Sequence, residues 1–170
     1  MIDPGAWAEA NLLYLSAAVA WMRLCLEKRI DFLQRTAGTV LGREPSRSER
    51  QDPVSTPPSS DQLAKAADEM AKAESSMDPL PALVLLSRRF ALSKFELNVL
   101  LLCAATEFDN SFSALCARAQ GDANKTYPTF ALALAIFDEP AWDALSPERP
   151  LARAPGRLDG TRCDSSGQVV

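Results

Sequence analysis

The chain has 170 residues, a net charge of −4 at pH 7 and a hydrophobic fraction of 47%, values typical of a globular protein with about one or two small domains. It contains no histidine, which removes the commonest general base, the commonest metal ligand and the usual partner of a nucleophilic serine or cysteine. The pI near 4.9 argues against a general nucleic-acid binder, because such proteins normally carry a basic face.

Residues 4–37 have the pattern of one long amphipathic helix, with Asp3 as a suitable N-cap. Residues recurring at steps of three and four form two neighbouring, mostly apolar rows: Trp7, Asn11, Tyr14, Ala18, Trp21 and Cys25, and beside them Leu12, Leu15, Val19, Met22, Leu26 and Leu33. Because a helix with such a stripe would not stay single in water, we expect it to pack on the rest of the chain, on another copy or on a separate partner. The candidate partner-binding residues are Trp7, Tyr14, Leu15, Trp21 and Met22.

Residues 43–81 contain a polar stretch, then a helical pattern and a turn. Residues 43–60 are rich in Ser, Pro, Arg and Glu and predict a flexible linker. Residues 61–77 predict an Ala-rich second helix whose opposite charges lie four residues apart on a solvated face. Residues 78–81 contain two prolines and predict a turn, after which Pro81 opens a third helix.

A strong helix signal follows in residues 92–109. Ser93 is a suitable N-cap, and Glu96 stands three residues later, which is the spacing of a capping box. The segment is apolar nearly all round and therefore predicts a helix at the centre of a domain. Its expected inward positions are Leu97, Leu100, Leu101 and Ala104, with Val99, Leu102 and Cys103 on the flanks.

Two shorter helical patterns complete this part of the chain. The first covers residues 110–119, with Asp109 as its cap, and the second covers residues 127–137. In the pattern at 110–119, the residues expected to point inward are Phe112, Leu115 and Cys116. Farther along the chain, Trp142 and Leu145 predict one last helical turn. Three short helices in close succession, without a strong strand signal, predict a helix-turn-helix or winged-helix unit.

The residue types that carry chemistry are sparse. Cys25, Cys103 and Cys116 lie within apolar helical patterns and are expected to be buried in a reducing compartment. No glycine is followed by lysine, so the phosphate-binding P-loop pattern is absent. We therefore expect no catalytic residue, no metal and no cofactor. The helix at 127–137 contains no Arg, Lys, Asn or Gln, which does not favour DNA binding.

The apolar run from Leu12 to Met22 is shorter than the ~20 residues that span a membrane. Asp3 and Glu9 precede it, whereas a signal peptide begins with a basic leader. We therefore expect no membrane association and a cytoplasmic location.

Several short motifs occur together in the second half of the chain. They are Leu92-Ser-x-Phe-Glu-x-x-Val-Leu-Leu-Leu-Cys-Ala, Phe108-Asp, Phe112, Leu115-Cys116, Gln120-Gly-Asp122, Tyr127-Pro-Thr-Phe130 and Trp142-x-x-Leu-Ser-Pro147. In combination they resemble the N-terminal region that precedes the ATPase module in a group of bacterial AAA-family ATPases. Some members of that group accompany phage-tail-like contractile injection systems. The resemblance covers roughly residues 6–152.

This resemblance implies an all-α fold with a long N-terminal amphipathic helix and a small winged-helix-like domain at residues 61–147, with the wing strand missing. It also implies a protein partner or the subunits of an ATPase ring as the binding partner. The Walker motifs of the family are absent from this sequence. We therefore expect a non-catalytic interaction or assembly domain and no ATPase activity in this chain.

The chain departs from the family pattern after Leu151. Residues 150–170 are rich in Gly, Ser and Arg and are expected to be a disordered tail. This departure indicates a truncated product, a frameshifted reading frame or a stand-alone adaptor. The alternative hypothesis is a small winged-helix regulator that binds DNA.

Overall fold

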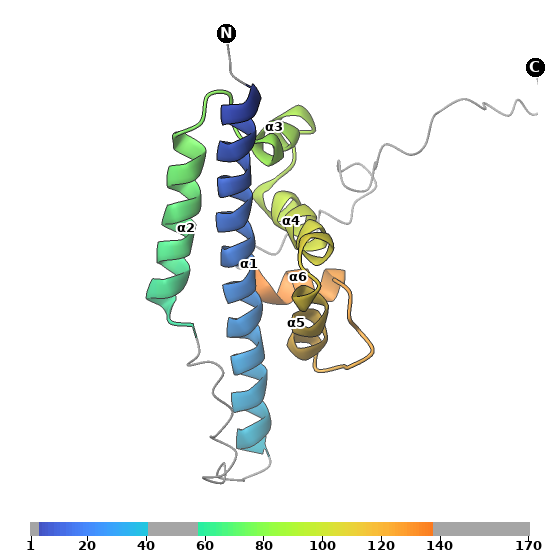
Figure 1. Cartoon of the computed structure of the whole chain (residues 1–170). Helices are drawn as coiled ribbons and strands as arrows, with labels where there is room; N and C mark the ends of the chain where they lie inside the picture. Colours follow the sequence, from blue (N-terminus) through green and yellow to red (C-terminus); the bar gives the residue numbers. More distant parts are fainter. Residues whose placement is uncertain (1–3, 41–57, 138–170) are drawn as a thin grey trace, which may run out of the picture.

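The computed structural model describes residues 4–40 and 58–137 (Figure 1). All regular structure in these ranges is helical, which confirms the expected all-α fold with a long N-terminal helix. The helices are α1 (Pro4–Val40), α2 (Ser60–Ser75), α3 (Ala82–Arg89), α4 (Lys94–Phe108), α5 (Ser111–Gln120) and α6 (Phe130–Ile136). Three predicted features lie outside the described residues: the linker at 43–57, the helical turn at Trp142 and Leu145, and the tail at 150–170.

Helix α1 is the axis of the fold. It has 37 residues and is therefore about 55 Å long. Helix α2 runs antiparallel along one side of α1, and α3 to α6 lie on the other side (Figure 1). Helix α1 contacts α2, α4, α5 and α6. Much of its apolar stripe, from Tyr14 to Leu26, is therefore buried against the rest of the chain, the first of the three arrangements that its sequence leaves open. No helix within the described ranges is both long and apolar enough to cross a membrane.

Two clusters of apolar side chains hold the helices together. The larger cluster joins α1 to α4, α5 and α6, and its least exposed large side chains are Met22, Leu26, Leu102, Phe112 and Cys116. The smaller cluster consists of Tyr14, Met77 and Val84, and it attaches the turn after α2 and the start of α3 to α1. Burying a Leu, Met or Phe side chain contributes about 1.5–3 kcal/mol, so the larger cluster dominates the stability.

The helix start that the sequence predicts most clearly, the capping box of Ser93 and Glu96, is confirmed. The Ser93 hydroxyl accepts a hydrogen bond from Glu96 N at 3.2 Å, and Ser93 N donates to Glu96 Oε2 at 2.8 Å. A second capping box opens α2, where Gln62 N donates to Ser59 Oγ at 3.1 Å. Each box satisfies backbone donors that a helix N-terminus otherwise leaves unpaired.

One predicted helix start is wrong by three residues. Helix α6 begins at Phe130 with Thr129 as its N-cap, whereas Tyr127 was expected to open it. The Gln120 side chain donates to the carbonyl oxygens of Lys125 and Tyr127, both at 3.0 Å, and this holds the preceding loop in a non-helical path.

Helix α5 begins at Ser111, and the preceding Asn110 makes no side-chain capping hydrogen bond. The Asp109 carboxylate instead accepts a hydrogen bond from Ser111 N at 2.8 Å, so Asp109 caps this helix start as expected.

Several predicted burial positions are also wrong. Cys103 and Leu12 are exposed, Leu12 to 62%, because none of the described helices α1 to α6 covers their sides of α4 and α1. In α4 the buried side chains include Phe95, Leu101 and Leu102, whereas the expected inward positions Leu97 and Leu100 are half-buried. A helix that is apolar on all sides carries too little contrast between its faces to indicate which one is buried.

Candidate protein-binding groove

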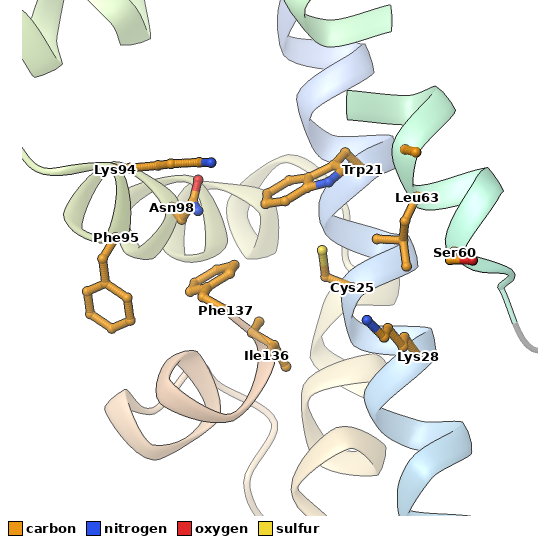
Figure 2. A pocket seen from close by; sticks show the side chains of 11 residues that line it. Trp21, Cys25, Lys28, Ser60, Leu63, Lys94, Phe95, Asn98, Ile136 and Phe137 are labelled. Atoms are coloured by element: carbon orange, nitrogen blue, oxygen red, sulfur yellow. The ribbon is translucent and has the colours of Figure 1, made fainter. Parts of the chain in front are cut away.

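Two adjoining cavities lie along α1 where the start of α2, the start of α4 and the end of α6 approach it. Figure 2 shows the larger of the two. Their volumes are about 390 and 270 Å³. The larger cavity is lined by Trp21, Cys25, Lys28, Ser60, Leu63, Ala64, Lys94, Phe95, Asn98, Ile136 and Phe137. The smaller is lined by Cys25, Lys28, Arg29, Phe32, Ala135 and Ile136. Because they share three side chains, we treat both as one feature, the α1 groove.

The floor of the α1 groove is aromatic. The rings of Trp21 and Phe137 are stacked, with centroids 6.2 Å apart and an interplanar angle of 7°. Phe95 meets Phe137 edge to face at 5.9 Å and 88°. Phe95 and Phe137 belong to the larger apolar cluster described above, and Trp21 packs against that cluster. The floor is therefore held in place by the core beneath it.

Among the described residues, the charged groups that line the α1 groove are all cationic: Lys28, Arg29 and Lys94. Figure 2 shows Lys94 extending from α4 toward Trp21, while Lys28 extends from α1 toward Ile136. The Arg29 guanidinium lies 5.2 Å from the centroid of the Phe32 ring, a cation–π arrangement. Its Nε is buried without a hydrogen-bond acceptor among the described residues. The groove therefore combines an apolar floor with positive charge.

The five partner-binding residues predicted from the sequence do not form one surface. Tyr14 and Met22 are buried in the two clusters, with exposures of 2% and 0%. Trp7 and Leu15 pack against the smaller cluster, and Trp7 Nε1 donates to the carbonyl oxygen of Pro79 at 3.1 Å. Of the five, Trp21 lines the α1 groove.

Sequence reasoning missed the cations of the groove. Lys28 and Phe32 continue the row of Trp21 and Cys25 at steps of three and four, so the periodicity of α1 was a usable signal for them. Lys94 gave no such signal, because it lies far along the chain and reaches the groove only through the packing of α4 near α1.

Asp109 has a structural partner on α1. Its Oδ2 lies 2.6 Å from Arg23 Nη2, and its Oδ1 accepts a hydrogen bond from Ser111 N at 2.8 Å. Hydrogen bonds from Ser111, together with the charge of Arg23, lower the pKa of Asp109. The carboxylate is thus ionised at neutral pH and joins α1 to the start of α5.

Two other ionisable side chains stay neutral at physiological pH. Burial, together with the charge of Glu74, raises the pKa of Tyr14 to about 12. Burial, together with the nearby Cys103, raises the pKa of Cys116 to about 11. Neither supplies a nucleophile at neutral pH. Within the described residues, no group of His, Cys, Asp or Glu side chains is arranged to hold a metal ion.

Helices α4, α5 and α6 form a compact three-helix unit packed on α1. In a helix-turn-helix protein the recognition helix presents polar side chains to base edges. In α6, the last of the described helices, the exposed residues are Ala131 and Ala135. The helix contains no charged or hydrogen-bonding side chain.

The sequence matches the family described as "Winged helix domain, variant" over residues 9–146. The chain belongs to this winged helix family. The match starts inside α1 and includes α2 to α6, so the long first helix is part of the winged helix unit of this variant. No curated protein matches significantly, and no solved structure does.

Proposed function

We propose that this winged helix chain is a non-catalytic protein-interaction module that helps to assemble an AAA-type ATPase in the cytoplasm, without a cofactor of its own. The winged helix family gives the fold, and the motif resemblance described above supports the link to the ATPase. The absence of histidine from the sequence supports the non-catalytic part, as do the neutral states of Tyr14 and Cys116.

The observation that carries the proposal is the composition of α6. Exposed Ala131 and Ala135 offer neither a donor nor an acceptor to a base edge and no charge to a phosphate. An apolar helix face of this kind suits contact with a protein. The adjacent α1 groove, with its aromatic floor, supplies the concave surface that protein segments commonly enter.

The test is association with an ATPase. The 170-residue chain is mixed with the AAA-type ATPase from the same genome that most resembles the family, and the mixture is studied by sedimentation velocity with and without ATP. We expect a complex that sediments faster than the ATPase alone. If both components sediment independently at about 100 µM, the assembly role is wrong.

A DNA-binding regulator is the second candidate, and two observations favour it: the chain belongs to a winged helix family, and Lys28, Arg29 and Lys94 gather beside α6. Charge-driven binding to DNA is strongest at low salt, so a gel-shift measurement with random duplex at about 50 mM salt tests this candidate. A retarded band that disappears in the K28E/K94E variant would establish DNA binding through the groove and replace the proposal above.

A further inference from the structure

We infer that the α1 groove binds an extended acidic segment of a partner protein, anchored by one aromatic or large aliphatic side chain. The inference rests on the proposed function, because it specifies the chemistry of the partner that an interaction module of this shape would recognise.

The shape of the groove indicates a peptide segment. Its two cavities share Cys25, Lys28 and Ile136 and follow α1 from Trp21 to Phe32. At 1.5 Å per residue this stretch of helix is about 16 Å long. An extended chain of about five residues has the same length at ~3.3 Å per residue. The groove is therefore too long for a single side chain and suits a short run of residues.

The charge of the groove indicates an acidic ligand. Lys28, Arg29 and Lys94 line it, and no Asp or Glu is among the lining residues that the structure describes, although the whole chain carries a net charge of −4. The ion pairs within the described residues involve Arg23, Arg35, Lys65 and Lys125, so none of the three groove cations is paired there. Carboxylates accept charge-assisted hydrogen bonds from such donors. The planar Arg29 guanidinium is suited to donate two hydrogen bonds to a single carboxylate.

The floor of the larger cavity indicates the anchor. Trp21, Phe95 and Phe137 provide ring faces and edges around a space of about 390 Å³. Aromatic side chains bury ~150–250 Å² each and pack favourably against other rings. If one aromatic side chain of the bound segment occupies the larger cavity, the carboxylates that flank it in that segment lie near Lys28 and Lys94. This is the usual division between a buried anchor and a charged rim.

The chain's own sequence contains a segment of this composition. Residues 138–145 read Asp-Glu-Pro-Ala-Trp-Asp-Ala-Leu and follow directly after Phe137, which lines the groove. The same sequence, as a separate peptide, is a suitable probe. Occupation of the groove by the chain's own copy is the alternative outcome that the experiment must separate from binding of a partner.

The experiment measures the fluorescence anisotropy of a dye-labelled peptide with this eight-residue sequence during titration with the full chain. We expect a Kd below about 100 µM, weakened at least tenfold by K28E/K94E and by replacing the peptide Trp with Ala. The matched control is K65E/K72E, which makes the same charge change on the exposed face of α2 and should leave the Kd unchanged. Circular dichroism verifies that each variant is folded.

Three outcomes would overturn the inference. The first is no binding to any form of the chain. The second is binding only when the chain's own carboxylates are removed in D138N/E139Q/D143N, which would mean that the groove takes this segment internally. The third is a groove-dependent shift with duplex DNA and none with the peptide. If the peptide does not bind but the chain still associates with the ATPase, the inference is wrong and the proposed function holds through another surface. If the peptide binds but the chain does not associate with the ATPase, only the proposed link to the ATPase is wrong.

Discussion

The indole of Trp21 lies parallel to the ring of Phe137, with the two centroids 6.2 Å apart, and this pair joins the middle of α1 to the end of α6. Phe137 is 7% exposed, so Phe137→Ala should lower the free energy of unfolding by about 3 kcal/mol through lost burial and a cavity. The matched control is Phe108→Ala, because Phe108 is 62% exposed and should change stability by less than about 0.5 kcal/mol. Urea unfolding followed by circular dichroism measures both, and equal effects would contradict this packing.

The two capping boxes should differ in their contribution to stability. Ser93→Ala removes a hydroxyl that bonds Glu96, whose side chain is 0% exposed, while Ser59→Ala removes the equivalent hydroxyl at the exposed start of α2. We expect Ser59→Ala to destabilise by about 0.5–1 kcal/mol and Ser93→Ala by about 2 kcal/mol, because the latter also leaves a buried carboxylate with fewer donors. Chemical denaturation of the two single variants decides this. A larger loss for Ser59→Ala would show that α2 governs the unfolding transition.

Helices α3 and α5 end in the same motif with different residues at the left-handed position. Leu92 N donates to Ser87 O at 2.8 Å after Ala91, and Asp122 N donates to Ala117 O at 3.1 Å after Gly121. The φ angles are 50° at Ala91 and 65° at Gly121, a region where a Cβ is unfavourable.

Single substitutions at these two positions should therefore change the free energy of unfolding in opposite directions. Ala91→Gly should raise the unfolding free energy by up to about 1 kcal/mol, because the strain at φ 50° is relieved. Gly121→Ala should lower it by about 1 kcal/mol, and since no atom lies within 4 Å of the added Cβ, the loss is conformational. Melting curves of the two variants test the pair, and a shift of both in the same direction would exclude this explanation.

Alkaline pH should destabilise the fold through Cys116 and Tyr14. Their folded-state pKa values, about 11 and about 12, lie above the unfolded values of ~8.5 and ~10. The stability that the neutral groups provide is thus fully present below about pH 8.5 and is lost as the pH rises to 11 and then 12. The melting temperature of the wild-type chain should fall more steeply between pH 9 and 11 than that of Tyr14→Phe/Cys116→Ala. Parallel curves would contradict the assignment.

Helix starts were predictable where the signal lies within four residues of chain. Ser93 with Glu96 is such a case, because both partners of the capping box belong to one turn and need no distant neighbour. The start of α6 was not predictable in this way. Thr129 caps it while its own hydroxyl donates to Gln120 Oε1 at 2.6 Å, and Gln120 lies at the end of the preceding helix. A contact across a loop overrides the local preference of Tyr127 and Pro128.

The amino-acid sequence by itself determined the helical class, the length of α1 and its wide apolar stripe, because periodicity and caps are properties of neighbouring residues. Only the tertiary structure decided which parts of that stripe are buried, leaving Leu12 exposed and Tyr14 enclosed. It also decided that Lys28 and Lys94 line one groove with Phe137. These residues belong to three helices, and their proximity depends on how whole helices pack, which no local pattern in the chain encodes.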